Sequence, residues 1–194
     1  MFSTKNLISK LIPTNIKSSQ LDEQDILPIA TTGEPVLTQK AVAVTQFDDH
    51  LKQLSIRMLK TMQAANGIGI AAPQVFSPLA VFIIASAPNE RYPDAPLMNP
   101  TLMVNPRIIY HSIDIDDGLE GCLSIPNKRF SISRYKTVMV EYQNIHGQKI
   151  QQHLEGFVAR IFQHELDHLL GITLLERTKI KKVGTYATGQ EAQA

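Results

Sequence analysis

The sequence has few cysteines, little net charge and no long hydrophobic run, and each shortage excludes a class of protein. Cys122 is the only cysteine, so an internal disulfide cannot form and nothing points to an oxidising compartment. The formal net charge is +1 without a basic stripe or a block of like charges, which argues against general attraction to nucleic acid or to an anionic membrane surface. The longest apolar stretches, such as LAVFIIASA at 79–87, are much shorter than the roughly 20 residues of a membrane-spanning helix. We expect neither a membrane span nor a direct nucleic-acid site.

What the chain does contain is typical of one globular domain. Its 194 residues are 43% hydrophobic and 19% charged, which is enough to bury a core. Residues 1–24 carry lysines but no arginine, cleavage-site pattern or sustained apolar run. We interpret them as an N-terminal extension of an intracellular protein, with organelle targeting as the alternative. A single folded domain is expected at 25–176 and a polar C-terminal tail at 177–194.

Hydrophobic periodicity predicts two main helices and several short strands. Apolar residues recur at helical spacing over about 45–65, with Thr45 as the expected cap. The helical period returns at 155–171, with Gly171 as the C-terminal cap. Four segments read as strands, of which the last two flank a hairpin turn: 79–86, 101–110, 136–143 and 148–154. These elements predict an α+β domain with short antiparallel strands.

The segment QHELDHLLG in the last helix carries the pattern of a metal site. His164 and His168 lie about 40° apart around a helix, so both imidazoles can reach one ion. Glu165 lies on the same side, where a carboxylate can serve as a base. A separate apolar stripe can dock the helix on the core: Val158, Phe162, Leu166 and Leu169. The alternative is a surface helix with two solvated histidines.

A catalytic metal of this kind needs a third protein ligand, and the sequence after the helix offers a poor choice. Leu174 stands where the longer H-E-x-x-H-x-x-G-x-x-H pattern has its last histidine. The ligand is therefore expected upstream, where Cys122 lies in GLEGCLSIP. A thiolate with two imidazoles is a known catalytic ligand set for zinc and suits softer divalent metals. A structural zinc would need His146 or His153 as a fourth ligand.

The stretch NGIGIAAPQV at 66–75 is a weak match to a phosphate-binding loop. It follows a helix, lacks a third glycine and has no Lys-Ser/Thr pair after it. Small residues such as Gly67 and Gly69 instead suggest that the backbone approaches another segment or a substrate closely. Pro73 fixes the direction of Gln74, whose side-chain amide can donate a hydrogen bond. The equal alternative is that Gln74 is a turn residue on a surface loop.

Three motifs, taken in order, resemble the pattern of peptide deformylase. They are GIGIAAPQ at 67–74, EGCLS at 120–124 and HELDH at 164–168. The likeness extends from about residue 25 to 176. It implies a compact α+β fold with antiparallel sheets packed around a central helix that bears the two histidines. It also implies the reaction, which is hydrolytic removal of the N-formyl group from the initiator methionine of new polypeptides with release of formate.

The resemblance also assigns roles to individual residues. Cys122, His164 and His168 would bind one divalent metal ion, natively Fe(II), with Zn, Ni or Co as substitutes. Glu165 would be the general base and acid. The other assignments are the oxyanion donors Gln74 and Leu123, the substrate-binding residues Ile68, Gly69, Arg129, Phe157 and Ile161, and the supporting residues Glu120 and Arg134. Phe157 and Ile161 share a helical face with the two histidines, so spacing alone also predicts an apolar pocket beside the metal.

By the same resemblance, the substrates are N-formyl-Met nascent peptides in a bacterial cytoplasm, with a transient contact to the ribosome. Leu119 and Asn127 replace a frequent Glu and a frequent Gly of the family, which bears on pocket shape and substrate preference. Two other functions stay open. One is another H-E-x-x-H metallopeptidase, for which Cys122 would be dispensable. The other is a deformylase-like binding protein with little catalysis.

Overall fold

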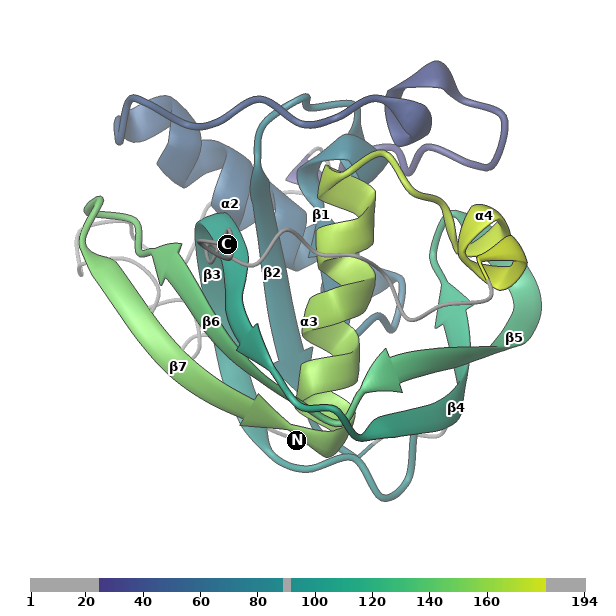
Figure 1. Cartoon of the computed structure of the whole chain (residues 1–194). Helices are drawn as coiled ribbons and strands as arrows, with labels where there is room; N and C mark the ends of the chain where they lie inside the picture. Colours follow the sequence, from purple (N-terminus) through teal and green to yellow (C-terminus); the bar gives the residue numbers. More distant parts are fainter. Residues whose placement is uncertain (1–24, 89–91, 181–194) are drawn as a thin grey trace, which may run out of the picture.

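The computed structural model describes residues 25–88 and 92–180 and places a long helix at the centre of the molecule (Figure 1). Within these residues, a five-stranded antiparallel sheet has the order β1 (Gly69–Ala71), β2 (Val81–Ser86), β3 (Met98–His111), β6 (Thr137–Gln143) and β7 (Lys149–Glu155). A second antiparallel sheet pairs β4 (Ile115–Cys122) with β5 (Ile125–Tyr135). The helices are α2 (Asp49–Ala64), α3 (Gly156–Leu169) and α4 (Leu174–Lys179), with short 3-10 helices η2 (Pro35–Thr38) and η3 (Ala72–Val75). The predicted α+β class, with antiparallel sheets around a central histidine-bearing helix, is confirmed.

The five-stranded sheet is covered by α3 on one face and by α2 on the other (Figure 1). Successive side chains of a strand point to opposite faces of its sheet. Phe82 and Ile84 therefore pack in the cluster that contains α3, whereas Val81 and Ile83 pack in the cluster that contains α2. Burial on both faces explains why β2 reads as an unbroken apolar run in the sequence.

Helix α3 is buried along most of its length, and its faces have different partners. The predicted apolar stripe packs against the sheet: Val158, Phe162, Leu166 and Leu169. Phe162 meets Phe82 edge to face, with ring centroids 5.2 Å apart. His164 and His168 are only 8% and 2% exposed, so the alternative of a surface helix with solvated histidines is wrong. One face of α3 thus holds the helix in the core, and another carries the histidines.

Helix α2 begins later than the sequence predicts. Asp48, not Thr45, is its N-cap, and the Asp48 carboxylate accepts a hydrogen bond from the Leu51 backbone N–H at 3.0 Å. The extended backbone of Asp48 delays the first helical turn until after this residue. The helix ends at Ala64, and the chain continues directly into the glycine-containing loop that leads to β1.

The hairpin of β4 and β5 is the largest element that the sequence does not predict. Its strands are polar and mostly exposed, so they lack the apolar alternation that reveals a half-buried strand. The pairing shifts after Gly121, so that Cys122 lies opposite Ile125 and the chain reverses through Leu123 and Ser124. The turn of this hairpin therefore places the EGCLS motif at one end of the two strands.

The chain reverses direction after α3 at a glycine. Gly171 has a φ of 73° and follows the C-cap residue Leu170, in agreement with the predicted helix end. Thr173 then begins α4 as its N-cap and forms a reciprocal capping box with Glu176. The two hydrogen bonds explain why a helix as short as α4 forms at this position.

Helix α4 extends beyond residue 176, the expected end of the folded domain. Helix α4 continues to Lys179, and the Arg177 side chain is buried, so the tail expected at 177–194 is folded at its start. Residues 1–24 and 181–194 lie outside the described residues, and the predictions made for them stay predictions. In the part of the chain that the structure describes, no helix has the length and apolar character needed to cross a membrane.

Replacing Gly171 by alanine tests how closely the end of α3 packs. A Cβ at Gly171 would lie 2.7 Å from the Thr38 carbonyl oxygen, whereas a Cβ at Gly156, which also has a positive φ, would meet nothing within 4 Å. Gly156→Ala should lower the free energy of unfolding by about 1–2 kcal/mol through backbone strain alone. Gly171→Ala should lower it by roughly 3 kcal/mol, because overlap adds to strain. Equal losses in chemical denaturation would contradict this packing.

Candidate active site

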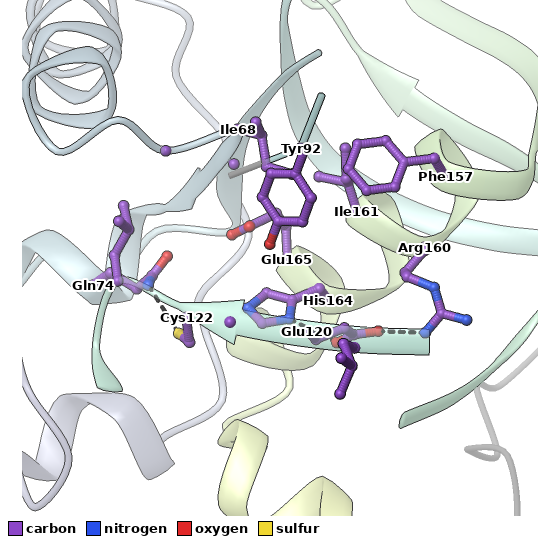
Figure 2. A pocket seen from close by; sticks show the side chains of 15 residues that line it. Ile68, Gln74, Tyr92, Glu120, Cys122, Phe157, Arg160, Ile161, His164 and Glu165 are labelled. Atoms are coloured by element: carbon purple, nitrogen blue, oxygen red, sulfur yellow. Dashed lines mark hydrogen bonds and ion pairs between the residues drawn. The ribbon is translucent and has the colours of Figure 1, made fainter. Parts of the chain in front are cut away.

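Most of the predicted site residues surround one pocket between the glycine-containing loop, β4 and α3 (Figure 2). Those that line it are Ile68, Gly69, Gln74, Glu120, Cys122, Leu123, Phe157, Ile161, His164 and Glu165. His168 and Arg134 do not line the pocket but are buried beside it. Arg129 also lies outside the lining, and its guanidinium stacks on a residue of the pocket wall.

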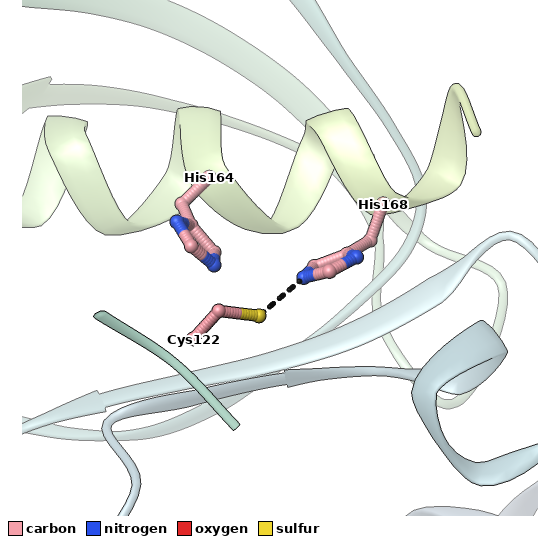
Figure 3. A group of neighbouring side chains, drawn as sticks. All are labelled: Cys122, His164 and His168. Carbon is pink, nitrogen blue, oxygen red and sulfur yellow. Dashed lines mark hydrogen bonds between the residues drawn. The ribbon is translucent and has the colours of Figure 1, made fainter. Parts of the chain in front are cut away.

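Cys122, His164 and His168 form a compact cluster, although Cys122 is distant from the histidines in the sequence (Figure 3). One potential ligand atom from each of the three residues lies within 4.8 Å of the other two. Cys122 Sγ is 3.2 Å from His168 Nε2, and the two imidazole centroids are 5.2 Å apart. The helical spacing of the histidines and the hairpin turn of EGCLS together produce this arrangement.

The chemistry of this cluster fits one divalent metal ion. Zinc bonds of about 2.0–2.3 Å place two ligands of one ion within about 4.6 Å of each other, which is close to the spread of these donors. Burial raises the pKa of the Cys122 thiol, but His168 and His164 outweigh burial and hold that pKa well below its ordinary value. The thiolate is the form of cysteine that binds metals. The three side chains are therefore suited in position, and Cys122 is also suited in its ionisation.

Glu120 holds His164 from behind. Its Oε2 lies 2.9 Å from His164 Nδ1, which leaves Nε2 as the ring nitrogen available to bind a metal. Arg134 donates to both Glu120 oxygens at 2.9 Å, and Arg160 donates to Oε1 at 3.0 Å. Burial raises the pKa of Glu120, but the charge and hydrogen bonds of Arg134, together with His164, hold it far below its usual range. Glu120 is therefore a permanent anion beside the imidazole.

Glu165 is a buried carboxylate with unusual freedom to exchange a proton. It is 3% exposed, and its Oε2 has no hydrogen-bond partner among the described residues. Burial raises the pKa of Glu165 to about 7, although the two neighbouring histidines oppose this shift. A Cβ at Gly69 would overlap the Glu165 carboxylate, so glycine leaves room for the carboxylate in its present position. Position and pKa both suit a general base and acid.

Gln74 is buried and oriented, so the alternative that it is a surface turn residue is wrong. It lies in η3, and its Oε1 accepts a hydrogen bond from the Ala71 backbone N–H at 2.9 Å. Its Nε2 donates to Ser124 Oγ at 3.1 Å. The same nitrogen donates to Cys122 Sγ at 3.5 Å (Figure 2). The donor end of the amide therefore faces the cysteine cluster. Leu123 lines the same pocket one residue beyond that cysteine.

The apolar part of the pocket includes an aromatic residue that the sequence did not reveal. Tyr92 lies near Ile68, Phe157 and Ile161 in Figure 2, and its ring centroid is 5.1 Å from that of Phe157. The Arg129 guanidinium lies over the Tyr92 ring, 4.9 Å from its centroid. Tyr92 follows a polar, proline-containing stretch, so no periodicity indicates that it is packed.

Three charged residues near the site were also missed. Arg160, Asp167 and Arg177 are each at most 7% exposed and take part in ion pairs. Two of them have a signal in the sequence that places them near the site. Asp167 lies within HELDH, and Arg160 lies one helical turn before His164. Arg177 carries no such signal. Sequence patterns do not show which charges become buried.

The fold and the site together define a metal-dependent hydrolase, with two histidines and a carboxylate on one helix beside a cysteine. A family model of polypeptide deformylase matches residues 26–183. The chain is 55% identical to peptide deformylase 2 of Shewanella oneidensis over 168 residues. This matched region covers 87% of this chain and 93% of that protein. A class I type b peptide deformylase of Acinetobacter baumannii, solved with Met-Ala-Ser bound, is 46% identical, with a TM-score of 0.77 over 78% of this chain and 98% of that one. The peptide deformylase structure from Thermotoga maritima is 37% identical, with a TM-score of 0.71 over 78% of this chain and 97% of that one.

The chain belongs to the peptide deformylase family. It is a hydrolase that removes the N-formyl group from the N-terminal formylmethionine of newly synthesised polypeptides. The reaction predicted from the three motifs is confirmed, and a different H-E-x-x-H metallopeptidase is not favoured. Members of this family depend on a metal, and the cysteine and histidine cluster is a site where one fits.

Gly69→Ala should impair turnover by displacing Glu165. The added Cβ would overlap the carboxylate, and a misplacement of about 1 Å in an active site can cost roughly a hundredfold in rate. We expect a loss of that order in kcat/KM for formyl-Met-Ala-Ser. Metal content, measured by atomic absorption, should stay at the wild-type level because the ligand cluster is untouched. Wild-type turnover in Gly69→Ala would show that Glu165 does not need this space.

Proposed function

We propose that Cys122, His164 and His168 hold the catalytic metal and that Fe(II) is the native ion, with Zn, Ni or Co as substitutes. The close approach of the three donors and the lowered pKa of Cys122 support this ligand set. A mixed thiolate and imidazole set accepts any of these metals, and the choice of Fe(II) follows the family. When bound, such an ion supplies Lewis-acid chemistry, because it lowers the pKa of water and polarises a carbonyl oxygen.

Glu165 is the group that moves protons in the proposed reaction. As the general base, it accepts a proton from the water that attacks the formyl carbon, and the C–N bond of the formamide then breaks. Glu165 returns the proton to the departing amine, so formate and a free N-terminus are the products. The observation that carries this role is a buried carboxylate beside the cluster with an unpartnered oxygen and a pKa near 7.

Gln74 and Leu123 stabilise the oxygen that becomes negative during attack. The Gln74 amide donates to Ser124 Oγ and to Cys122 Sγ, which places its N–H groups beside the cluster where the substrate carbonyl would lie. Leu123 contributes its backbone N–H from the hairpin turn. Preorganised donors of this kind typically contribute about 3–4 kcal/mol each to transition-state stabilisation.

The methionine side chain occupies the apolar part of the pocket in this proposal. Ile68, Phe157 and Ile161 form its wall, and Tyr92 closes the side next to Phe157. Gly69 lines the pocket beside Glu165, which supports close approach of the substrate backbone, and the stacking of Arg129 on Tyr92 supports a contact with the following residues of the peptide. The Acinetobacter baumannii enzyme was solved with Met-Ala-Ser bound, which supports a peptide that begins with methionine.

We further propose that the enzyme acts in a bacterial cytoplasm on nascent chains, in transient contact with the ribosome. The similar proteins from Shewanella oneidensis and Acinetobacter baumannii are bacterial, and the substrate is a newly made chain. Organelle targeting by residues 1–24 is the alternative. Residues 25–176 together with the rest of α4 form the catalytic unit, because Arg177 is buried against it.

Glu165→Ala should reduce deformylation severely without removing the metal. Loss of a general acid and base typically costs about 10²–10⁴-fold in rate, and none of the three ligands changes. The measurement is formate release from formyl-Met-Ala-Ser by protein prepared anaerobically with Fe(II), with iron content determined on the same sample. Glu165→Gln serves as the isosteric control and should be equally impaired. Equal activity in the wild type and both variants would refute the proposed role.

Tyr92→Ala should weaken substrate binding more than it slows chemistry. The ring packs on Phe157, and the loss of such an aromatic contact corresponds to roughly a tenfold rise in KM for formyl-Met-Ala-Ser, with kcat little changed. Tyr92→Phe keeps the ring and should behave like the wild type. Tyr110→Ala, at an exposed tyrosine, is the surface control. An unchanged KM in Tyr92→Ala would exclude the ring from the methionine pocket.

A further inference from the structure

Helix α4 is joined to the core by a buried arginine. Arg177 is 5% exposed, and its Nε donates to Asp167 Oδ2 at 2.8 Å while its Nη2 donates to Asp167 Oδ1. This two-point contact matches the planar guanidinium to the carboxylate, which a lysine ammonium cannot reproduce. Asp167 lies on α3, one residue before His168. The contact therefore connects α4 to the helix that bears both histidines.

The same carboxylate is shared with a second arginine that leads toward the site. Arg134 on β5 donates from Nη1 to Asp167 Oδ2. Its remaining nitrogens, Nε and Nη2, hold Glu120 at 2.9 Å each. Arg134 is 1% exposed, and both of its carboxylate partners are at most 4% exposed. Because buried charges must be paired and hydrogen-bonded, Arg134 is held between these two carboxylates.

The row of contacts ends at an imidazole of the cysteine and histidine cluster. Glu120 Oε2 accepts from Arg134 and lies 2.9 Å from His164 Nδ1. A carboxylate behind a histidine ligand sets the orientation of its ring and the nitrogen that it presents. Arg177, Asp167, Arg134, Glu120 and His164 thus form one continuous series of hydrogen-bonded charged groups. It crosses α4, α3, β5 and β4, and Figure 1 shows α4 beside β5.

We propose that Arg177 is a positioning residue for His164. By holding both oxygens of Asp167, Arg177 fixes the position of that carboxylate, so Asp167 holds Arg134 where it keeps its two-point contact with Glu120, and Glu120 keeps the His164 ring in place. Without the two-point contact of Arg177, Asp167 no longer holds Arg134 in a fixed position, and the ring loses its fixed orientation. This inference rests on the proposed role of His164 as a metal ligand. Its expected consequence is faster loss of the metal.

Arg177→Lys is the test variant, because it keeps the positive charge and removes the two-point geometry. The full-length protein is loaded with Zn(II), and zinc release to excess 4-(2-pyridylazo)resorcinol is followed by absorbance. Groups that orient metal ligands typically change metal affinity by about 10–100-fold. We expect zinc release from Arg177→Lys to be at least about tenfold faster than from the wild type. The Tm of each protein is measured in parallel.

Two variants of the same helix separate positioning from simple stabilisation of α4. Glu176→Ala removes the capping box with Thr173 and loosens α4 but touches none of the charged groups in the series. It should lower the Tm and leave zinc release unchanged. Lys179→Gln, at an exposed position, should change neither. A rise in zinc release in Glu176→Ala as large as that in Arg177→Lys would overturn the proposal, because loss of α4 stability would then explain both.

A double variant covers the case in which a single change leaves a buried charge and prevents folding. Asp167→Asn with Arg177→Gln removes one charge of each sign, so no new unpaired charge is buried. It should fold and also release zinc faster. If Arg177→Lys and the double variant both released zinc at the wild-type rate, only the positioning role would be overturned. Failure of the wild type to retain zinc would overturn the ligand assignment itself, so the two failures are distinguishable.

Discussion

The ion pair between Glu120 and Arg134 connects the β4–β5 hairpin to the centre of the molecule. Buried charges are tolerated only when they are paired and hydrogen-bonded, and Glu120 meets this condition through Arg134, Arg160 and His164. Cys122 lies two residues further along the same strand. The pairing that satisfies a buried carboxylate therefore also sets how closely the cysteine approaches the histidines.

This requirement reaches residues that have no chemical role. A Cβ at Gly118 would lie 2.8 Å from Arg160 Cζ, so a glycine on β4 is needed for the guanidinium to reach Glu120. Arg160 also donates to the Ile132 carbonyl oxygen at 2.7 Å and so ties α3 to β5. The polar strands, which lack an apolar face of their own, are held on the core by charge pairs as well as by a small cluster around Cys122 and Leu174.

Helix α3 shows how stability and function divide one element. Its apolar stripe packs on the sheet with Phe82 and stabilises the fold through burial. Glu165, on the same helix, is buried with an unpartnered oxygen, which costs free energy of folding. That cost is tolerated at sites where a carboxylate must exchange a proton near neutral pH. Gly69 leaves this carboxylate the space that a Cβ would otherwise occupy.

Sequence patterns predicted those parts of the protein whose signal is local. The helical period of α3, the apolar run of β2, which is buried on both faces, and the alternation in β6 of the β6–β7 hairpin are all visible in the local sequence. The hairpin of β4 and β5 has no such alternation, and the start of α2 depended on whether Thr45 or Asp48 capped it. Local patterns cannot decide between two competent caps.

The sequence by itself predicted the reaction class through the resemblance of its three ordered motifs to peptide deformylase, because these motifs contain every residue type that the chemistry requires. It also determined that His164, Glu165 and His168 share one side of a helix, since that follows from helical geometry. Only the tertiary structure decided that Cys122 meets these histidines, that Tyr92 closes the pocket, and that Arg177 is buried on Asp167. These contacts join segments far apart in the chain, and the pairing of buried charges depends on how the sheets and helices pack.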